Sequence, residues 1–169
     1  HTTGEVTIDL VSNEEAAALD AVFTGTTSTR TIGVNGPARI RSAGTTNFEA
    51  RKRLYLDADG IRALSAQGDA RTSTRTLGVS SSARIGNRLV QRIASRKVAE
   101  QKGAGERIAG RHAADQIKDR FNRQVNEQLT DDRTGIFGRL RAALVRRNAL
   151  PQEMGVSSTD DTLNLVWLQ

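Results

Sequence analysis

The stretch that decides the fold occurs in two similar copies, TSTRTIGVNGPARI from Thr27 to Ile40 and TSTRTLGVSSSARI from Thr72 to Ile85. The copies agree at ten of fourteen positions, at an offset of 45 residues. Their threonines and branched apolar residues are typical of β-strands. Two copies are too few for a solenoid, which needs about three stacked units. We therefore predict two equivalent strands from an internal duplication; a duplicated ligand loop is the alternative.

The two copies are expected to end differently. In the first copy, Asn35 and Gly36 predict a tight hairpin turn, although Pro37 follows at once. In the second copy, the serines at 80–82 are predicted to cap the start of a helix. The apolar positions of both copies are expected to face one common apolar layer: Ile32, Val34, Leu77 and Val79.

Other stretches of the first half also alternate apolar and polar residues, which predicts half-buried strands. These stretches are EVTIDLV from Glu5, LDAVFTGT from Leu19 and NFEARKRLYLDADG from Asn47. We interpret them as an antiparallel sheet of hairpins with one apolar face. The segment TLNLVWLQ from Thr162 alternates in the same way. It is predicted to return to that sheet.

The following segment has helical periodicity, with apolar residues recurring from Ile85 to Leu129. A single straight helix over 83–129 would be roughly 70 Å long. A compact domain of this size has a radius of gyration of about 15 Å, so we expect Gly103 and Gly105 to break or bend the helix. A second, shorter amphipathic helix is predicted from Ile136 to Asn148.

These elements predict an α+β fold, in which an antiparallel, hairpin-rich sheet packs against a long, glycine-interrupted helix and a second shorter helix. A length of 169 residues suits one domain, with a strand-rich part at 1–80, a helical part at 83–148 and a C-terminal strand at 155–169. No run of about eighteen apolar residues is present, so no membrane span is expected. Because the sequence starts at His1 without a signal peptide, we expect a mature or excised domain of a longer protein.

The charge is unevenly distributed along the chain. Residues 1–83 carry nine basic and nine acidic side chains, whereas residues 84–147 carry sixteen basic and seven acidic ones. The last 22 residues have three acidic side chains and no basic one. The positive balance therefore lies in the helical segment, which is where a charged partner is expected to bind.

Catalytic chemistry has little support in the sequence. The absence of cysteine excludes disulfides and thiolate sites. His112 stands on an arginine-rich helical segment, where a solvated histidine is more common than a general base. The DADG segment from Asp57 lacks the later ligands of a calcium loop and fits a hairpin turn better. We therefore predict no catalytic, cofactor-binding or metal-binding residue, and no enzyme activity.

One constellation stands out, a ladder of arginines every four residues along the start of the long helix: Arg84, Arg88, Arg92 and Arg96. Like charges at this spacing are destabilising, and positive charge in the first turn opposes the helix dipole. One interpretation is structural: strand carboxylates meet the ladder (candidates are Asp9, Asp20, Glu49 and Asp57), or the arginine stems cover apolar surface with their heads in water. The other is an anionic partner: nucleic acid, an acidic protein or an acidic envelope polymer.

The segments AGRHAADQIKDRFNRQVNEQL from Ala109 and GVNGPARI from Gly33 resemble uncharacterised secreted or envelope proteins of arginine-rich bacteria. The resemblance covers about a third of the chain and implies a domain outside the cytoplasm. It carries over no functional residue.

From these observations we expect a non-catalytic binding or structural module of a larger bacterial secreted or cell-envelope protein, without a cofactor. Its partner would be a protein or an acidic envelope polymer. The alternative is a basic domain that binds nucleic acid or another polyanion through the arginine ladder. Nucleic acid is the less favoured partner because aromatic residues for base stacking are scarce.

Overall fold

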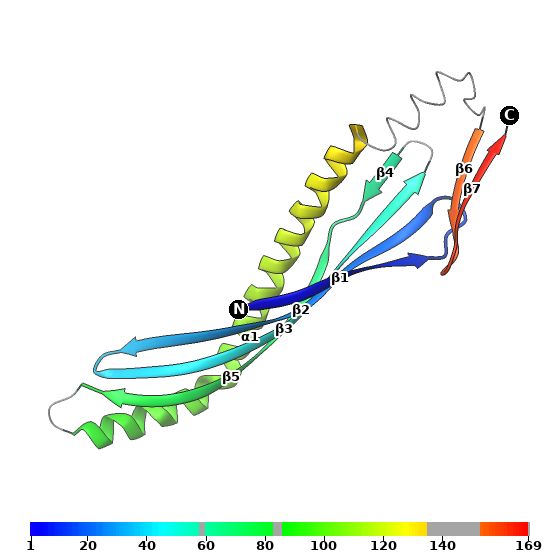
Figure 1. Cartoon of the computed structure of the whole chain (residues 1–169). Coiled ribbons are helices and arrows are strands. Elements are labelled where there is room, and N and C mark those ends of the chain that lie inside the picture. The colour runs from blue at the N-terminus through cyan, green and yellow to red at the C-terminus, as the bar shows by residue number, and fades with distance from the viewer. Residues whose placement is uncertain (58–59, 83–85, 135–152, 169) are drawn as a thin grey trace. The chain divides into compact units, whose positions relative to one another are not determined.

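The computed structural model describes residues 1–57, 60–82, 86–134 and 153–168 (Figure 1). The elements among them are β1 (Thr2–Val11), β2 (Ala17–Asn35), β3 (Ala38–Asp57), β4 (Gly60–Ala63), β5 (Gln67–Ser81), α1 (Asn87–Thr134), β6 (Glu153–Ser158) and β7 (Leu163–Leu168). The chain divides into two compact units. Unit 1 comprises His1–Glu5, Thr24–Glu49 and Asp69–Gln116, and unit 2 comprises Val6–Phe23, Ala50–Gly68 and Ile117–Gln169.

The main sheet has five strands, and β3 is its centre. Strand β3 pairs with β2 along one edge and with β4 and β5 along the other, while β1 pairs with β2. Strands β2 and β3 have 19 and 20 residues, and both units contain part of each. Strand β2 is rich in β-branched residues, which favour such an extended segment.

Residues 27–35 of the first copy form the end of β2, and residues 72–81 of the second copy form the end of β5; these two strands lie on either side of β3 in unit 1. Thr29 and Thr74, which occupy the same place in the two copies, both approach Gly44 of β3. The Thr29 hydroxyl donates a hydrogen bond to the Gly44 carbonyl oxygen (3.5 Å). A Cβ atom on Gly44 would lie 2.9 Å from Thr29 Oγ1 and 3.7 Å from Thr74 Cγ2. The prediction of two equivalent strands is confirmed, and Gly44 leaves room for both copies.

The ends of the two copies differ, but only one ends as predicted. Strand β2 ends at Asn35 and β3 begins at Ala38, with Gly36 at a φ of 57°, so the hairpin turn is confirmed. The predicted serine caps are wrong, because β5 continues to Ser81. Helix α1 starts at Asn87 after Gly86, whose carbonyl oxygen accepts hydrogen bonds from two amides of the first turn.

Unit 2 contains a small core between strands and the second part of α1. Alanines at 21, 50 and 66 are buried together with Phe121 of α1, and the Phe23 ring stacks on the Phe121 ring at a centroid distance of 5.8 Å. Small alanine side chains allow α1 to approach the strands closely. Ile117 and Val125, one turn before and after Phe121, complete this helix face.

Several strand positions predicted to be covered are instead exposed. Val6 and Ile8 of β1 are 58% and 66% exposed, and Ile32 and Val34 of β2 are 63% and 67% exposed. Leu77 of β5 is also exposed. The common apolar layer predicted for the repeated phrase is therefore not formed among the described residues. Alternation indicates which side chains share a face, but a second layer is needed to bury that face.

Of the two alternatives predicted at the glycines of the long helix, the break is wrong. Helix α1 continues through Gly103 and Gly105, which both have helical backbone and are exposed. The expected limit on helix length assumed one compact domain. It does not apply here, because α1 extends through two units. Each glycine lowers helix stability by about 1 kcal/mol relative to alanine, which a long run of good helix formers can offset.

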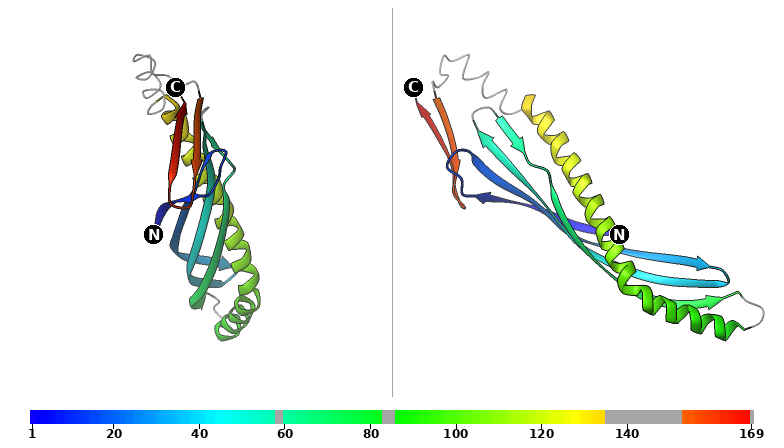
Figure 2. Two further views of the ribbon diagram at one scale, coloured as in Figure 1. Left: turned by 90° about the vertical axis from the view of Figure 1, so that its right-hand side faces the viewer. Right: turned by 180° about the vertical axis from the view of Figure 1, so that it is seen from behind.

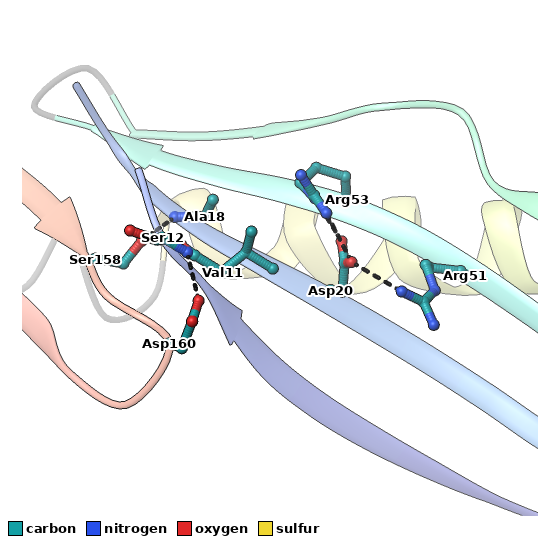
Figure 3. Close-up of polar contacts among 8 residues, drawn as sticks. All are labelled: Val11, Ser12, Ala18, Asp20, Arg51, Arg53, Ser158 and Asp160. Atoms are coloured by element: carbon teal, nitrogen blue, oxygen red, sulfur yellow. Dashed lines mark hydrogen bonds and ion pairs between the residues drawn. The ribbon is translucent and has the colours of Figure 1, made fainter. Parts of the chain in front are cut away.

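The C-terminal strand does not return to the main sheet. Strand β7 pairs antiparallel with β6 in a separate two-stranded sheet. Ser158, at the end of β6, is buried in unit 2; its hydroxyl donates to the Val11 carbonyl oxygen (2.5 Å) and accepts from the Ala18 amide (2.9 Å). Asp160 accepts a hydrogen bond from the Ser12 amide (Figure 3). These contacts hold the turn of the hairpin against the end of β1.

The α+β class is therefore confirmed, but the predicted architecture is wrong in its glycine break and in the placement of the last strand. Among the described residues α1 is the one helix. The second helix predicted from Ile136 to Asn148 lies within 135–152, outside the described residues.

Candidate functional site

A buried carboxylate in unit 2, Asp20 of β2, is held by two arginines of β3. Asp20 Oδ1 accepts from Arg53 Nε (2.5 Å) and Asp20 Oδ2 from Arg53 Nη2 (2.8 Å), a bidentate pair. Arg51 Nη1 lies 3.4 Å from Asp20 Oδ2 (Figure 3). The hydrogen bonds from Arg53 hold the pKa of Asp20 below its ordinary value, and the same pair raises the pKa of Arg53. Both oxygens of Asp20 are engaged by guanidinium groups, which favours a structural role.

A buried lysine lies on the same strand of unit 2. Lys52 is 1% exposed, and its ammonium donates to the Leu64 carbonyl oxygen (2.7 Å) and to Asn122 Oδ1 of α1. The Ala66 amide donates to the same Asn122 oxygen (3.3 Å). Burial lowers the pKa of Lys52, because desolvation disfavours the ammonium form. This cluster ties β3, the segment before β5 and α1 together.

The described residues bring together no group of histidine, aspartate and glutamate side chains that could hold a metal ion. His112 is exposed on α1. Asp57 forms a hairpin turn, as the sequence predicted: it pairs with Gly60, whose amide donates to Asp57 Oδ1, and its carboxylate also contacts Arg62.

The ladder arginines lie in unit 1, at the start of α1. Arg88, Arg92 and Arg96 are exposed, while Arg84 lies outside the described residues. Arg96 Nε pairs with Glu100 Oε1 of its own helix at 2.9 Å. Within the described part of the chain, Arg88 and Arg92 have no ion-pair partner. Two of the strand carboxylates proposed as partners, Asp20 and Asp57, bind strand arginines instead.

Further exposed cations, which the sequence reasoning missed, lie on the strands of unit 1. Arg41 of β3 extends over β5, where its Nη2 atom would lie 3.4 Å from a Cβ atom on Gly78. The Ser82 amide donates to the Pro37 carbonyl oxygen (2.9 Å), so β5 ends beside the β2–β3 turn, near the first turns of α1 (Figure 2). We call the eight exposed cations nearest the β2–β3 turn, the end of β5 and the start of α1 the basic end of unit 1: Arg30, Arg39, Arg41, Arg75, Arg88, Arg92, Arg96 and Lys97.

The basic end contains no acidic residue in its own segments. Residues 21–48 and 70–99 include no aspartate or glutamate. Unit 1 has thirteen basic and six acidic side chains, a net charge of +7, whereas unit 2 has twelve and thirteen, a net charge of −1. The charge balance of residues 1–83 hides this pattern, because that segment also contains acidic residues of unit 2, which cancel the charge of the strand arginines of unit 1. The two acid-free segments were the signal in the sequence that could have revealed it.

Glu106 connects α1 to this sheet in unit 1. Its Oε1 atom accepts from the Thr74 amide (2.5 Å) and from the Thr74 hydroxyl (2.8 Å). The hydrogen bond from the Thr74 amide is the main cause that lowers the pKa of Glu106, and the bond from the Thr74 hydroxyl adds to it. Gly110, one turn further along α1, is buried against β5. The helix is thus fixed on the sheet beyond the ladder, while Arg88, Arg92 and Arg96 stay exposed.

Searches with the sequence and the structure found no matching family model, curated protein or solved structure. In the described part of the chain, no helix combines the length and the apolar character needed to cross a membrane.

Proposed function

We propose that this chain is a non-catalytic binding module of a larger bacterial secreted or cell-envelope protein, and that the basic end of unit 1 binds an anionic partner. The secreted or envelope setting is supported by the sequence resemblance alone. The anionic partner is supported by the arrangement of charge in unit 1.

The observation that carries this proposal is the group of eight exposed cations in segments without a carboxylate, of which Arg96 pairs with Glu100 just beyond its segment. Like charges on one surface repel each other and lower the stability of the folded unit. An anionic partner removes this repulsion when it binds. Arginine supplies seven of the eight cations, and its planar guanidinium donates paired hydrogen bonds to phosphate or carboxylate oxygens.

Sequence-specific recognition of nucleic acid has less support. Single strands bind by stacking their bases on exposed aromatic rings, and the chain has one tryptophan, one tyrosine and four phenylalanines. Phe48 and Phe121 are buried, and Phe23 is packed against the core of unit 2. We therefore expect binding through charge, with weak discrimination between anionic polymers.

The test compares two variants with the same loss of charge. Arg88→Gln/Arg92→Gln removes two cations from the ladder, whereas Arg120→Gln/Arg123→Gln removes two exposed cations from the part of α1 in unit 2. The probe is inorganic polyphosphate, titrated over a range of salt concentrations. We expect the ladder variant to lower the slope of log affinity against log salt by about 1.5, at 0.7–0.9 per lost phosphate contact.

The control variant should keep the slope of the unmodified chain. An equal effect of both variants would show that net charge alone determines binding, and the basic end would then be no specific site. No binding to polyphosphate at low salt would contradict the proposal altogether. Duplex DNA in the same assay measures whether nucleic acid is preferred over polyphosphate.

A further inference from the structure

The outward face of the first turns of α1 carries apolar side chains among its arginines. Leu89 and Ile93 are 61% and 54% exposed, and they are one turn apart on the helix. Each directly follows a ladder arginine in the sequence, Arg88 and Arg92. The neighbouring face, about 100° further around the helix, has its own half-buried apolar residues: Val90, Ala94 and Val98. This part of α1 is therefore apolar toward unit 1 and also apolar toward solvent.

The end of the β2–β3 hairpin has the same composition. Ile32 and Val34 are exposed near the turn, and Arg39 and Arg41 follow it on β3. Exposed apolar residues with arginines nearby, and without carboxylates, thus occur on two different elements at the same end of unit 1. Exposed apolar residues that gather into one patch mark surfaces that bind a partner.

A soluble polyanion would bind the arginines of this surface but not its apolar side chains. It neutralises the arginines but leaves Leu89 and Ile93 in water. An anionic lipid surface offers phosphate groups to the guanidinium groups and an apolar layer a few ångströms deeper to the leucine and isoleucine. Helices at membrane surfaces combine basic residues with apolar side chains that reach this layer.

We propose that the basic end of unit 1 binds the surface of an anionic lipid bilayer, with Leu89 and Ile93 inserted between headgroups and Arg88 and Arg92 at the phosphates. This inference rests on the proposed function, because it names the partner of the same basic end. Both free phosphate polymers and lipid headgroups present phosphate oxygens, and the apolar pair is what distinguishes the lipid surface.

The first experiment measures co-flotation of the full chain with vesicles. Vesicles of phosphatidylcholine with phosphatidylglycerol should bind the protein, and vesicles of phosphatidylcholine alone should not. Leu89→Ser/Ile93→Ser should weaken binding to the anionic vesicles by about tenfold or more, because buried apolar surface is lost. The same variant should bind polyphosphate like the unmodified chain. Ile108→Ser, which changes another exposed apolar residue of α1 in unit 1, is the matched control.

The outcomes separate the two proposals. If Leu89→Ser/Ile93→Ser binds anionic vesicles normally, the apolar pair is not inserted and the inference fails. If the protein binds polyphosphate but no vesicle, the lipid surface is excluded; in both cases the anionic partner stands. If Arg88→Gln/Arg92→Gln binds polyphosphate normally, the proposed function itself fails. Tighter binding to duplex DNA than to anionic vesicles would make nucleic acid the partner and overturn the lipid inference.

A second measurement detects insertion directly, with a fluorescent label at position 89. The chain contains no cysteine, so Leu89→Cys provides one attachment point for a fluorophore that reports the polarity of its surroundings. We expect a blue shift with anionic vesicles and none with polyphosphate. A fluorophore on Ile108→Cys should report water in both cases. A label at position 89 that stays in water on bound vesicles would overturn the inserted geometry.

Discussion

The buried carboxylate of Asp20 shows how one residue organises two neighbouring strands of unit 2. Its side chain is 3% exposed, and the bidentate pair with Arg53 compensates the desolvation of the carboxylate. Arg53 itself is 34% exposed, so its guanidinium can reach water if the carboxylate is removed. The pair is therefore worth less than a fully buried one.

We predict that Asp20→Asn lowers the free energy of unfolding by about 2 kcal/mol at neutral pH. Because the folded-state pKa of Asp20 is lowered, its contribution is present above about pH 4 and is lost as the pH falls through the folded-state value. The variant should consequently lose less stability on acidification than the unmodified chain. Urea unfolding over this pH range checks both points, and Asp9→Asn, at an exposed position, should change little.

Lys52 is a buried cation whose partners are neutral oxygens. We predict that Asn122→Leu destabilises the chain by about 2 kcal/mol, since the ammonium keeps only the Leu64 carbonyl oxygen. The double variant Lys52→Met/Asn122→Leu should cost less than the sum of the two single changes, which a double-mutant cycle measures.

The pH dependence gives a second check on Lys52. Its folded-state pKa is lowered from 10.5, so the folded form loses the proton first as the pH rises. The unmodified chain should then gain stability relative to Lys52→Met between the folded-state pKa and about pH 10.5. A constant difference over this range would show that Lys52 is not buried as described.

At the scale of the element, α1 includes three glycines with different surroundings. Around Gly105 there is open space, and a Cβ atom on Gly103 would meet only the Arg107 guanidinium, at 3.7 Å. A Cβ atom on Gly110 would lie 2.8 Å from the Ala70 carbonyl oxygen of β5. The first two glycines are therefore tolerated in the helix, while the third allows the helix to contact the strand.

We predict that Gly103→Ala and Gly105→Ala each raise the free energy of unfolding by about 0.5–1 kcal/mol, through higher helix propensity. Gly110→Ala should lower it, because helix and strand must separate. Thermal unfolding followed by circular dichroism measures these changes. A stability loss in Gly105→Ala would indicate that the helix is broken there, as the sequence alone suggested.

At the scale of the whole molecule, the units differ in charge rather than in secondary structure. Both contain strands and part of α1, yet the net positive charge belongs to unit 1. The ladder on α1 could be predicted from its spacing of four residues. The strand arginines could not be assigned to the same end, because that requires knowing that β5 ends beside the β2–β3 turn.

The sequence by itself determined the four long strands of the main sheet, the hairpin at Gly36, the presence of a long helix and the equivalence of the two repeated phrases. It missed β4, and it predicted one strand at residues 155–169 where the structure has β6 and β7. Periodicity and turn chemistry act over a few residues, so they can be read locally. The tertiary structure decided that both phrases flank β3 at Gly44, that β7 pairs with β6, and that Asp20 binds strand arginines. It also decided which apolar residues are exposed. These outcomes depend on contacts between residues far apart in the chain, and local patterns carry no information about the partner.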